Sequence, residues 1–169
     1  MAVPVSNPLD DIVSDVIERE GGSAVTNRPN DPGGRTQYGI SERANPKAWL
    51  DGKVTEQEAK EIYISKYVVW PKFHQIPATH QQLQAQLIDY GVHSGPQLAI
   101  QKLQAILNVE VDGIIGPQTL LAIRGCDPRI LNNRLVIERV KMVGRVVQKN
   151  PGQLSDLSGF LNRALSFIL

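Results

Sequence analysis

The sequence predicts an α+β fold in which helices dominate and β structure is confined to a small hairpin region near residues 25–40. Three observations support this prediction. Apolar residues recur at three- and four-residue steps over most of the chain, which is typical of amphipathic helices. Proline and glycine divide the second half of the chain into separate helical segments. A loop rich in Asn, Asp, Pro and Gly leads into the one short segment with strand character, residues 36–40.

Length and composition indicate an ordinary globular protein. A chain of 169 residues can form one domain with a sizeable core. The net charge of +1, with no run of basic residues, argues against a nucleic-acid partner. Cys126 is the single cysteine, which excludes an intramolecular disulfide and a zinc site built from cysteines. We therefore expect packing alone to hold the fold, and we expect a monomer.

Membrane, metal and cofactor signals are weak in this sequence. No stretch approaches the roughly 20 apolar residues that span a bilayer. Residues 1–7 lack the charged and apolar regions of a signal peptide. The three histidines, His74, His80 and His93, are widely spaced, and the loop before residue 31 lacks the ligand spacing of a calcium loop. We expect no stable membrane association, no metal and no cofactor.

The first helix is predicted to begin at Pro8, with Asn7 as its N-cap. Its apolar stripe includes Val16 and Ile17, and Glu20 follows these residues by four and three positions. Glu20 therefore continues the stripe. Partial removal from water favours the protonated form of a carboxylic acid, which a general acid needs. The alternative is a solvated residue in the last turn, and the helical phase alone does not decide between them.

The loop after this helix supplies a second carboxylate. Asp31 lies eleven residues after Glu20 and begins an Asp-Pro-Gly-Gly turn. Thr36 follows in the strand-like segment. Two carboxylates and a hydroxyl around one cleft would suit glycoside hydrolysis, in which one carboxyl protonates the leaving oxygen. Asp31 could equally be a turn residue, and Thr36 an ordinary strand residue.

Residues 41–78 are predicted to contain a turn and a helix. We expect Trp49 and Leu50 to be anchors before the turn, and Thr55 and Glu58 to form a capping box. Tyr67 and Trp70 could stack on sugar rings, although such residues more often belong to a core or its edge.

From about residue 79 the chain is predicted to be helical almost to its end. Pro96, Pro117 and Pro128 each fit the start of a helix, and Asp127 fits an N-cap. Residues 112–113 and 150–152 are predicted breaks. No linker separates this region, so we expect one domain over residues 1–169. Its predicted parts are a catalytic lobe (1–78) and a helical lobe (79–169) with the substrate cleft between them.

Several blocks of the sequence match one known pattern. The first block contains residues 20–22, Asn27 and the run Asp-Pro-Gly-Gly-Arg-Thr-Gln-Tyr-Gly-Ile-Ser from Asp31 to Ser41. The others are Tyr63 with residues 67–71 and 76–77, residues 89–95 with 103–104, and residues 111–119. Together they resemble glycoside hydrolase family 108, which comprises lysozyme-like N-acetylmuramidases common among phage endolysins. The last of these blocks resembles the family's C-terminal predicted peptidoglycan-binding region.

The resemblance implies a lysozyme-like fold and a set of site residues. It makes Glu20 the catalytic acid and places Asp31 and Thr36 beside it in a Glu/Asp/Thr arrangement. The substrate-binding residues it implies are Asn30, Tyr38, Gly39, Tyr67 and Trp70. The sequence departs from the family where Ser23 replaces an aromatic residue and Arg28 replaces an aspartate. These departures concern the wall of the cleft and not the identity of the acid.

The expected function is hydrolysis of the β-1,4 bond between N-acetylmuramic acid and N-acetylglucosamine in bacterial peptidoglycan. A lytic transglycosylase, in which the glutamate acts alone, is one alternative. A noncatalytic wall-binding or virion protein is another. The resemblance further implies an endolysin made in the host cytoplasm, which would reach the periplasmic peptidoglycan with the help of a holin.

Overall fold

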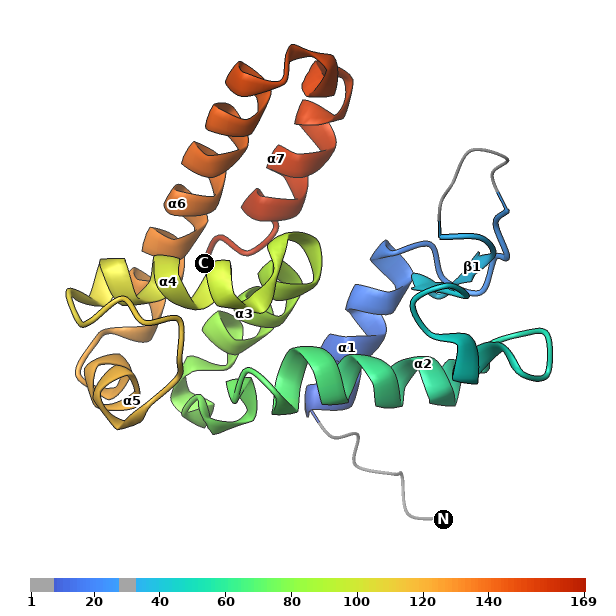
Figure 1. The fold of residues 1–169 in the computed structure, drawn as a ribbon. Helices are drawn as coiled ribbons and strands as arrows, with labels where there is room; N and C mark the ends of the chain where they lie inside the picture. Colours follow the sequence, from blue (N-terminus) through green and yellow to red (C-terminus); the bar gives the residue numbers. More distant parts are fainter. Residues whose placement is uncertain (1–7, 28–32) are drawn as a thin grey trace. The chain divides into compact units, whose positions relative to one another are not determined.

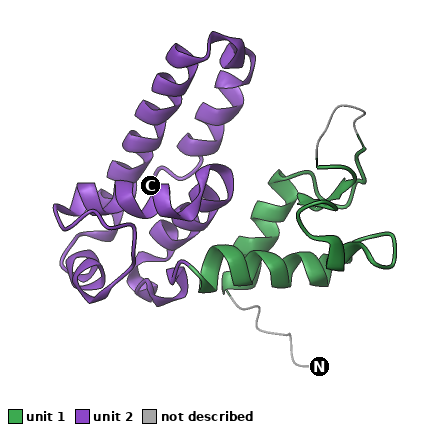
Figure 2. Ribbon diagram, viewed as in Figure 1, with its two compact units in different colours: residues 1–70 green, residues 71–169 purple. Residues whose placement is uncertain are grey.

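The computed structural model describes residues 8–27 and 33–169, and helices dominate it (Figure 1). Among the described residues, β structure consists of one two-stranded antiparallel hairpin and an isolated bridge between Thr26 and Thr36. The predicted fold class, α+β and predominantly helical, is therefore confirmed. The chain forms two compact units, residues 1–70 and residues 71–169 (Figure 2). The predicted N-cap, Asn7, lies outside the described residues.

The first unit begins with the predicted helix, α1 (Pro8–Arg19). Asp10 and Asp11 lie in its first turn, where negative charge is favourable to the helix dipole. Val13, Val16 and Ile17 are buried on its apolar face. Helix α1 packs against α2 (Glu56–Tyr63).

The hairpin consists of β1 (Thr36–Gln37) and β2 (Ile40–Ser41), with Gln37 opposite Ile40. Tyr38 and Gly39 form the two-residue turn, with φ angles of 52° and 72°. Two consecutive residues with positive φ are what a type I′ hairpin turn requires. The single strand expected over residues 36–40 is therefore wrong, because the chain reverses in the middle of that segment.

Between the hairpin and α2 lies the short 3-10 helix η1 (Pro46–Trp49). Trp49 is buried, and its indole N–H donates to the Ile40 carbonyl over 3.2 Å. It is the anchor that the sequence predicted. Leu50, the other expected anchor, is 83% exposed, so that prediction is wrong.

Helix α2 begins with the predicted capping box. The Thr55 hydroxyl accepts from the Glu58 backbone N–H, and the Glu58 carboxylate accepts from the Thr55 backbone N–H over 2.8 Å. The chain then continues as a π-helix, η2 (Ile64–Val69), to the end of the first unit. π-Helical segments are rare and often occur at functional sites.

The second unit is entirely helical. Its α-helices are α3 (Gln81–Ser94), α4 (Pro96–Leu107), α5 (Pro117–Arg124), α6 (Pro128–Lys149) and α7 (Leu157–Leu165). Its 3-10 helices are η3 (Phe73–Gln75), η4 (Ala78–His80) and η5 (Pro151–Asp156). Proline occupies the first turn of α4, α5 and α6, and the Asp127 carboxylate caps α6, as predicted.

The core of the second unit is formed where α3 packs against α4 and α6. Leu83, Leu87 and Tyr90 of α3 are buried along the predicted stripe. Helices α6 and α7 pair as a hairpin of helices, drawn in orange and red in Figure 1. Within the part of the chain that the structure describes, no helix is both long and apolar enough to cross a bilayer.

Candidate active site

Glu20 directly follows α1 and continues its last turn. Its backbone N–H donates to the carbonyls of Val16 and Ile17 over 3.1 and 3.2 Å. The residue is half-buried, and its carboxylate oxygen Oε1 is shielded from solvent. The carboxyl group therefore lies at the end of the apolar stripe and is partly desolvated, which is one of the two alternatives that the helical phase left open.

Two glycines end the helix and turn the chain back toward the hairpin. Gly21 and Gly22 have φ angles of 111° and 54°, a backbone conformation that residues with a side chain rarely adopt. The Gly22 carbonyl accepts from the Tyr38 N–H over 2.9 Å, and Thr26 and Thr36 exchange two backbone hydrogen bonds of 2.8 Å. The Glu-Gly-Gly sequence thus holds the segment after Glu20 against β1.

The hairpin turn reaches the acid through Gly39. A Cβ atom added to Gly39 would lie 3.0 Å from the Glu20 Cβ and would overlap the hydroxyl of Tyr63, which is buried at the end of α2. Glu20, the turn of the hairpin and Tyr63 therefore meet at one point. Only glycine leaves room for this approach.

Gln37 joins three segments around this point and was missed by the sequence reasoning. Its side-chain amide donates to the Ser23 carbonyl over 3.0 Å, and its carbonyl oxygen accepts from the Val54 N–H over 2.9 Å. The loop after α1, the hairpin and the segment before α2 are thereby tied together. A lone polar residue in a short strand carries no sequence signal for such long-range bonds.

An ion pair fixes the base of the hairpin. Arg35 donates to both carboxylate oxygens of Glu42 over 2.9 and 2.8 Å, and its guanidinium lies 4.8 Å from the centre of the Trp49 ring. The hydrogen bonds from Arg35 hold the pKa of Glu42 below its usual range. The pair keeps the strands in register next to the buried Trp49.

The aromatic residues expected to contact sugar occupy different environments. Tyr67 is half-buried, and its ring lies 5.4 Å from that of Tyr63, tilted by 41°. Lys66 Nζ lies 5.1 Å from the centre of the Tyr67 ring. Trp70 is 70% exposed, so its indole face is open to stacking. Tyr67 thus packs on Tyr63, which lies beside Gly39 and Glu20. Trp70 lies on the surface of the first unit.

The remaining predicted site residues are placed only in part. Thr36 and Tyr38 are half-buried in the hairpin, next to Gly39. Asn30 and Asp31 lie outside the described residues. Within the described ranges, no three His, Cys, Asp or Glu side chains gather as metal ligands.

Two family models match the chain. Glycosyl hydrolase 108 matches residues 13–95, which include Glu20, the hairpin and Tyr63. Predicted Peptidoglycan domain matches residues 98–165, which include most of α4 and all of α5, α6 and α7. No protein among the curated relatives searched matches the chain.

A solved structure is similar to nearly the whole chain. The structure of Brucella abortus SagA aligns with a TM-score of 0.66 and 30% sequence identity, covering 94% of this chain and 94% of that one. The residues around Glu20 fall within the glycosidase match, and the solved relative spans both matched regions. This chain therefore belongs to glycosyl hydrolase family 108 and is a glycosidase with a predicted peptidoglycan domain.

Proposed function

We propose that the protein hydrolyses the β-1,4 bond between N-acetylmuramic acid and N-acetylglucosamine in bacterial peptidoglycan, with Glu20 as general acid. The observation that carries the proposal is the half-buried Glu20 carboxyl, with Oε1 shielded from solvent, where α1, the hairpin turn and Tyr63 meet. This point lies within the residues matched by the glycosidase family. The second matched region supports peptidoglycan as the polymer.

In the proposed reaction, Glu20 donates its proton to the glycosidic oxygen as the bond to the anomeric carbon breaks. Positive charge then develops on the sugar ring. Asp31 stabilises that charge or orients the attacking water, and Thr36 holds the water. The water adds its hydroxyl to the anomeric carbon, and its remaining proton returns to the Glu20 carboxylate. One water is therefore consumed for each bond broken, and the acid is restored for the next cycle.

In the proposal, the substrate is contacted by residues of the hairpin and by aromatic residues in and just after the π-helix η2. Tyr38 and Gly39 contact the glycan at the hairpin, Asn30 is a further substrate-binding residue, and Tyr67 and Trp70 offer aromatic faces to sugar rings. The exposure of Trp70 supports its part, because a stacking face must be open before the substrate binds.

The experiment that tests the reaction is mass analysis of the soluble fragments released from purified peptidoglycan, after borohydride reduction. We expect fragments that carry one added water and end in reduced N-acetylmuramic acid. Anhydro sugars would instead show a lytic transglycosylase, and fragments ending in reduced N-acetylglucosamine would place the cut at the other glycosidic bond. Either result would overturn the proposed bond cleavage.

Delivery to the wall is a separate part of the proposal. We propose a phage endolysin that is made in the host cytoplasm and reaches peptidoglycan when a holin opens the membrane. Expression in a bacterial host with and without a co-expressed holin tests this route. Lysis that depends on the holin is expected, and equally rapid lysis without it would refute the route.

A further inference from the structure

Tyr63 is a buried tyrosine beside the candidate acid, and it has no part in the reaction as described so far. It is the last residue of α2, and it is 3% exposed. Its hydroxyl lies at the Gly39 turn, where a Cβ atom added to Gly39 would overlap it. The same Cβ position is 3.0 Å from Cβ and 3.6 Å from Cγ of Glu20. The tyrosine hydroxyl and the glutamate side chain are therefore close neighbours.

The carboxyl group of Glu20 is within reach of this hydroxyl. It is bonded to the Cγ atom that lies near Gly39, and its Oε1 atom is shielded from solvent. A phenolic O–H can donate to a carboxyl oxygen. Hydrogen bonds of a catalytic group are often long before the substrate binds, and they tighten in the substrate complex. The hydroxyl is therefore placed to orient the carboxyl group during the reaction.

The surroundings of Tyr63 fix its ring at this point. The ring packs on that of Tyr67, with 5.4 Å between the ring centres. Tyr63 is also the residue at which α2 passes into the π-helix η2, and π-helical segments often occur at functional sites. A phenylalanine ring would fill the same space without the cost of burying a hydroxyl. Packing alone therefore does not explain why a tyrosine occupies this position.

We propose that Tyr63 is a positioning residue, whose hydroxyl donates to one oxygen of the Glu20 carboxyl and leaves the other oxygen to carry the proton. The inference rests on the proposed function, from which it takes Glu20 as general acid. As the proton passes to the glycosidic oxygen, the acceptor becomes charged and the hydrogen bond from Tyr63 strengthens. The hydroxyl thus stabilises the transition state more than the bound substrate.

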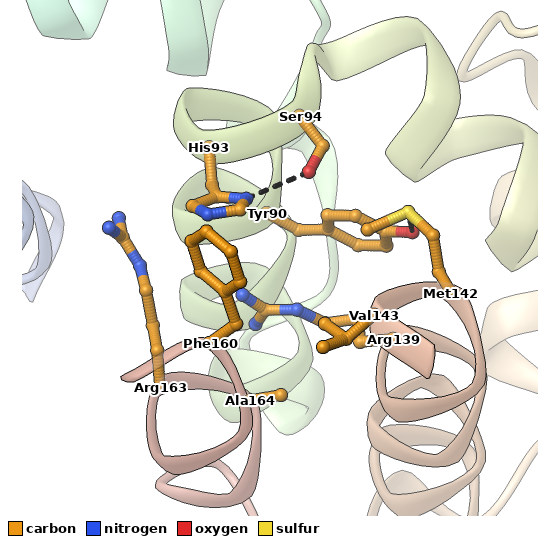
Figure 3. A pocket seen from close by; sticks show the side chains of 9 residues that line it. All are labelled: Tyr90, His93, Ser94, Arg139, Met142, Val143, Phe160, Arg163 and Ala164. Atoms are coloured by element: carbon orange, nitrogen blue, oxygen red, sulfur yellow. Dashed lines mark hydrogen bonds between the residues drawn. The ribbon is translucent and has the colours of Figure 1, made fainter. Parts of the chain in front are cut away.

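Tyr63→Phe tests the inference because it keeps the ring and removes the hydroxyl. Tyr90→Phe is the matched control: Tyr90 is a buried tyrosine of the second unit, and its hydroxyl donates to Met142 Sδ over 3.0 Å (Figure 3). The substrate is a soluble glycan fragment of peptidoglycan. We expect kcat to fall roughly 10- to 100-fold in Tyr63→Phe, with KM unchanged, and both to stay near wild type in Tyr90→Phe. An unchanged kcat in a folded Tyr63→Phe variant would overturn the inference.

The pH profile of kcat separates positioning from support of the fold. A general acid works only while protonated, so kcat falls at high pH as Glu20 ionises. A hydrogen bond to the carboxylate favours the charged form, so its loss lets Glu20 keep its proton to higher pH. We expect the alkaline arm of the profile to move up by roughly one pH unit in Tyr63→Phe and to stay in place in Tyr90→Phe. A slower enzyme with an unshifted profile would show that Tyr63 only supports the fold, and would refute its role.

A second change at Tyr63 keeps the hydroxyl and gives the opposite prediction. 3-Fluorotyrosine incorporated at Tyr63 has a more acidic hydroxyl, which is a stronger donor. We expect the alkaline arm to move to lower pH in this protein, and movement to higher pH or no movement would contradict the inference. This measurement decides the question even where Tyr63→Phe does not fold.

Glu20→Gln separates this inference from the proposed function. An inactive Glu20→Gln variant together with an unaltered Tyr63→Phe variant would refute the positioning role and leave the proposed function intact. An active Glu20→Gln variant would refute Glu20 as general acid, and the inference with it.

Discussion

Replacing Gly39 with alanine probes the point where the hairpin meets Glu20. The backbone at Gly39 has a φ of 72°, and a left-handed conformation costs a residue with a side chain roughly 1–2 kcal/mol. The new Cβ would also overlap the Tyr63 hydroxyl and press on Glu20, and overpacking of this kind costs about 1–3 kcal/mol. The backbone strain and the overlap should both lower the free energy of unfolding of Gly39→Ala.

Gly52→Ala is the matched control within the same unit. Gly52 has a φ of 78°, but a Cβ there would meet no atom within 4 Å. This variant therefore has the cost of the left-handed backbone without the overlap. The difference in the free energy of unfolding between the two variants, measured by urea denaturation, isolates the overlap at the site.

Activity should separate the two variants further. A displacement of about 1 Å at a catalytic group can cost roughly 100-fold in rate, so we expect Gly39→Ala to digest peptidoglycan far more slowly than Gly52→Ala. Adding Tyr63→Phe removes the hydroxyl that the alanine would strike, and the double variant should recover part of the lost stability. Equal stability and equal activity for Gly39→Ala and Gly52→Ala would refute the close contact of Gly39, Glu20 and Tyr63.

Three further predictions concern charges and caps. Asp89→Asn leaves the buried guanidinium group of Arg139 and the partly buried one of Arg163 without their anion, so we expect it to lower the free energy of unfolding, measured by urea denaturation, by about 3–5 kcal/mol. Glu138→Gln removes a carboxylate from more exposed ion pairs and should lower it by less than about 1 kcal/mol. Similar losses for the two variants would contradict this prediction. The pKa of Asp112 is held below its ordinary value of 3.8 by hydrogen bonds, of which the one from the Gln104 side chain has the largest effect. The stability that Asp112 contributes is therefore present above pH 3.8 and is lost as the pH falls through the folded-state pKa. In Asp112→Asn we expect the free energy of unfolding to fall less steeply as the pH is lowered. Identical acid-unfolding curves for the variant and the wild type would contradict this. Thr55→Ala removes the cap of α2 and should cost about 0.5–2 kcal/mol by denaturation, with Thr55→Ser as the control that keeps it.

Helix starts could be predicted from the sequence because their signals are local. Pro8, Pro96, Pro117 and Pro128 each begin an α-helix, since the fixed φ of proline fits the first turn and its missing N–H is not needed there. The Thr55 cap depends on residues only three positions apart. Such features are decided within one turn of chain, so no knowledge of tertiary packing was needed.

The hairpin turn was not predicted because tertiary contacts select it. Tyr38 adopts a positive φ that tyrosine rarely takes, and the backbone bond to Gly22 helps hold it there. The segment therefore looked like one continuous strand. The role of Gly39 likewise depends on Tyr63, which is distant in the sequence and close only in the fold.

The same reason explains why the candidate site and the ion pair of Asp89 with Arg139 could not be predicted in full: their residues are far apart in the sequence and meet only in the fold. Helical phase placed Glu20 at the end of the apolar stripe, but no pattern linked it to Tyr63 or Gln37. Asp89 and Arg139 are fifty residues apart in the chain, so their pairing could not be seen before α3 and α6 were packed together.

The proposed reaction depends on Glu20 as the proton donor, and comparing Glu20→Gln with Glu18→Gln on purified peptidoglycan tests that role most directly. Glu18 lies two residues earlier, exposed in the last turn of α1, so its variant controls for the loss of one carboxylate from the same segment. Both changes keep the side-chain shape. We predict that release of reducing sugar falls by roughly 10²–10⁴-fold in Glu20→Gln, with the fold intact by circular dichroism, and stays near wild type in Glu18→Gln. A folded Glu20→Gln variant that retains wild-type activity would contradict the account.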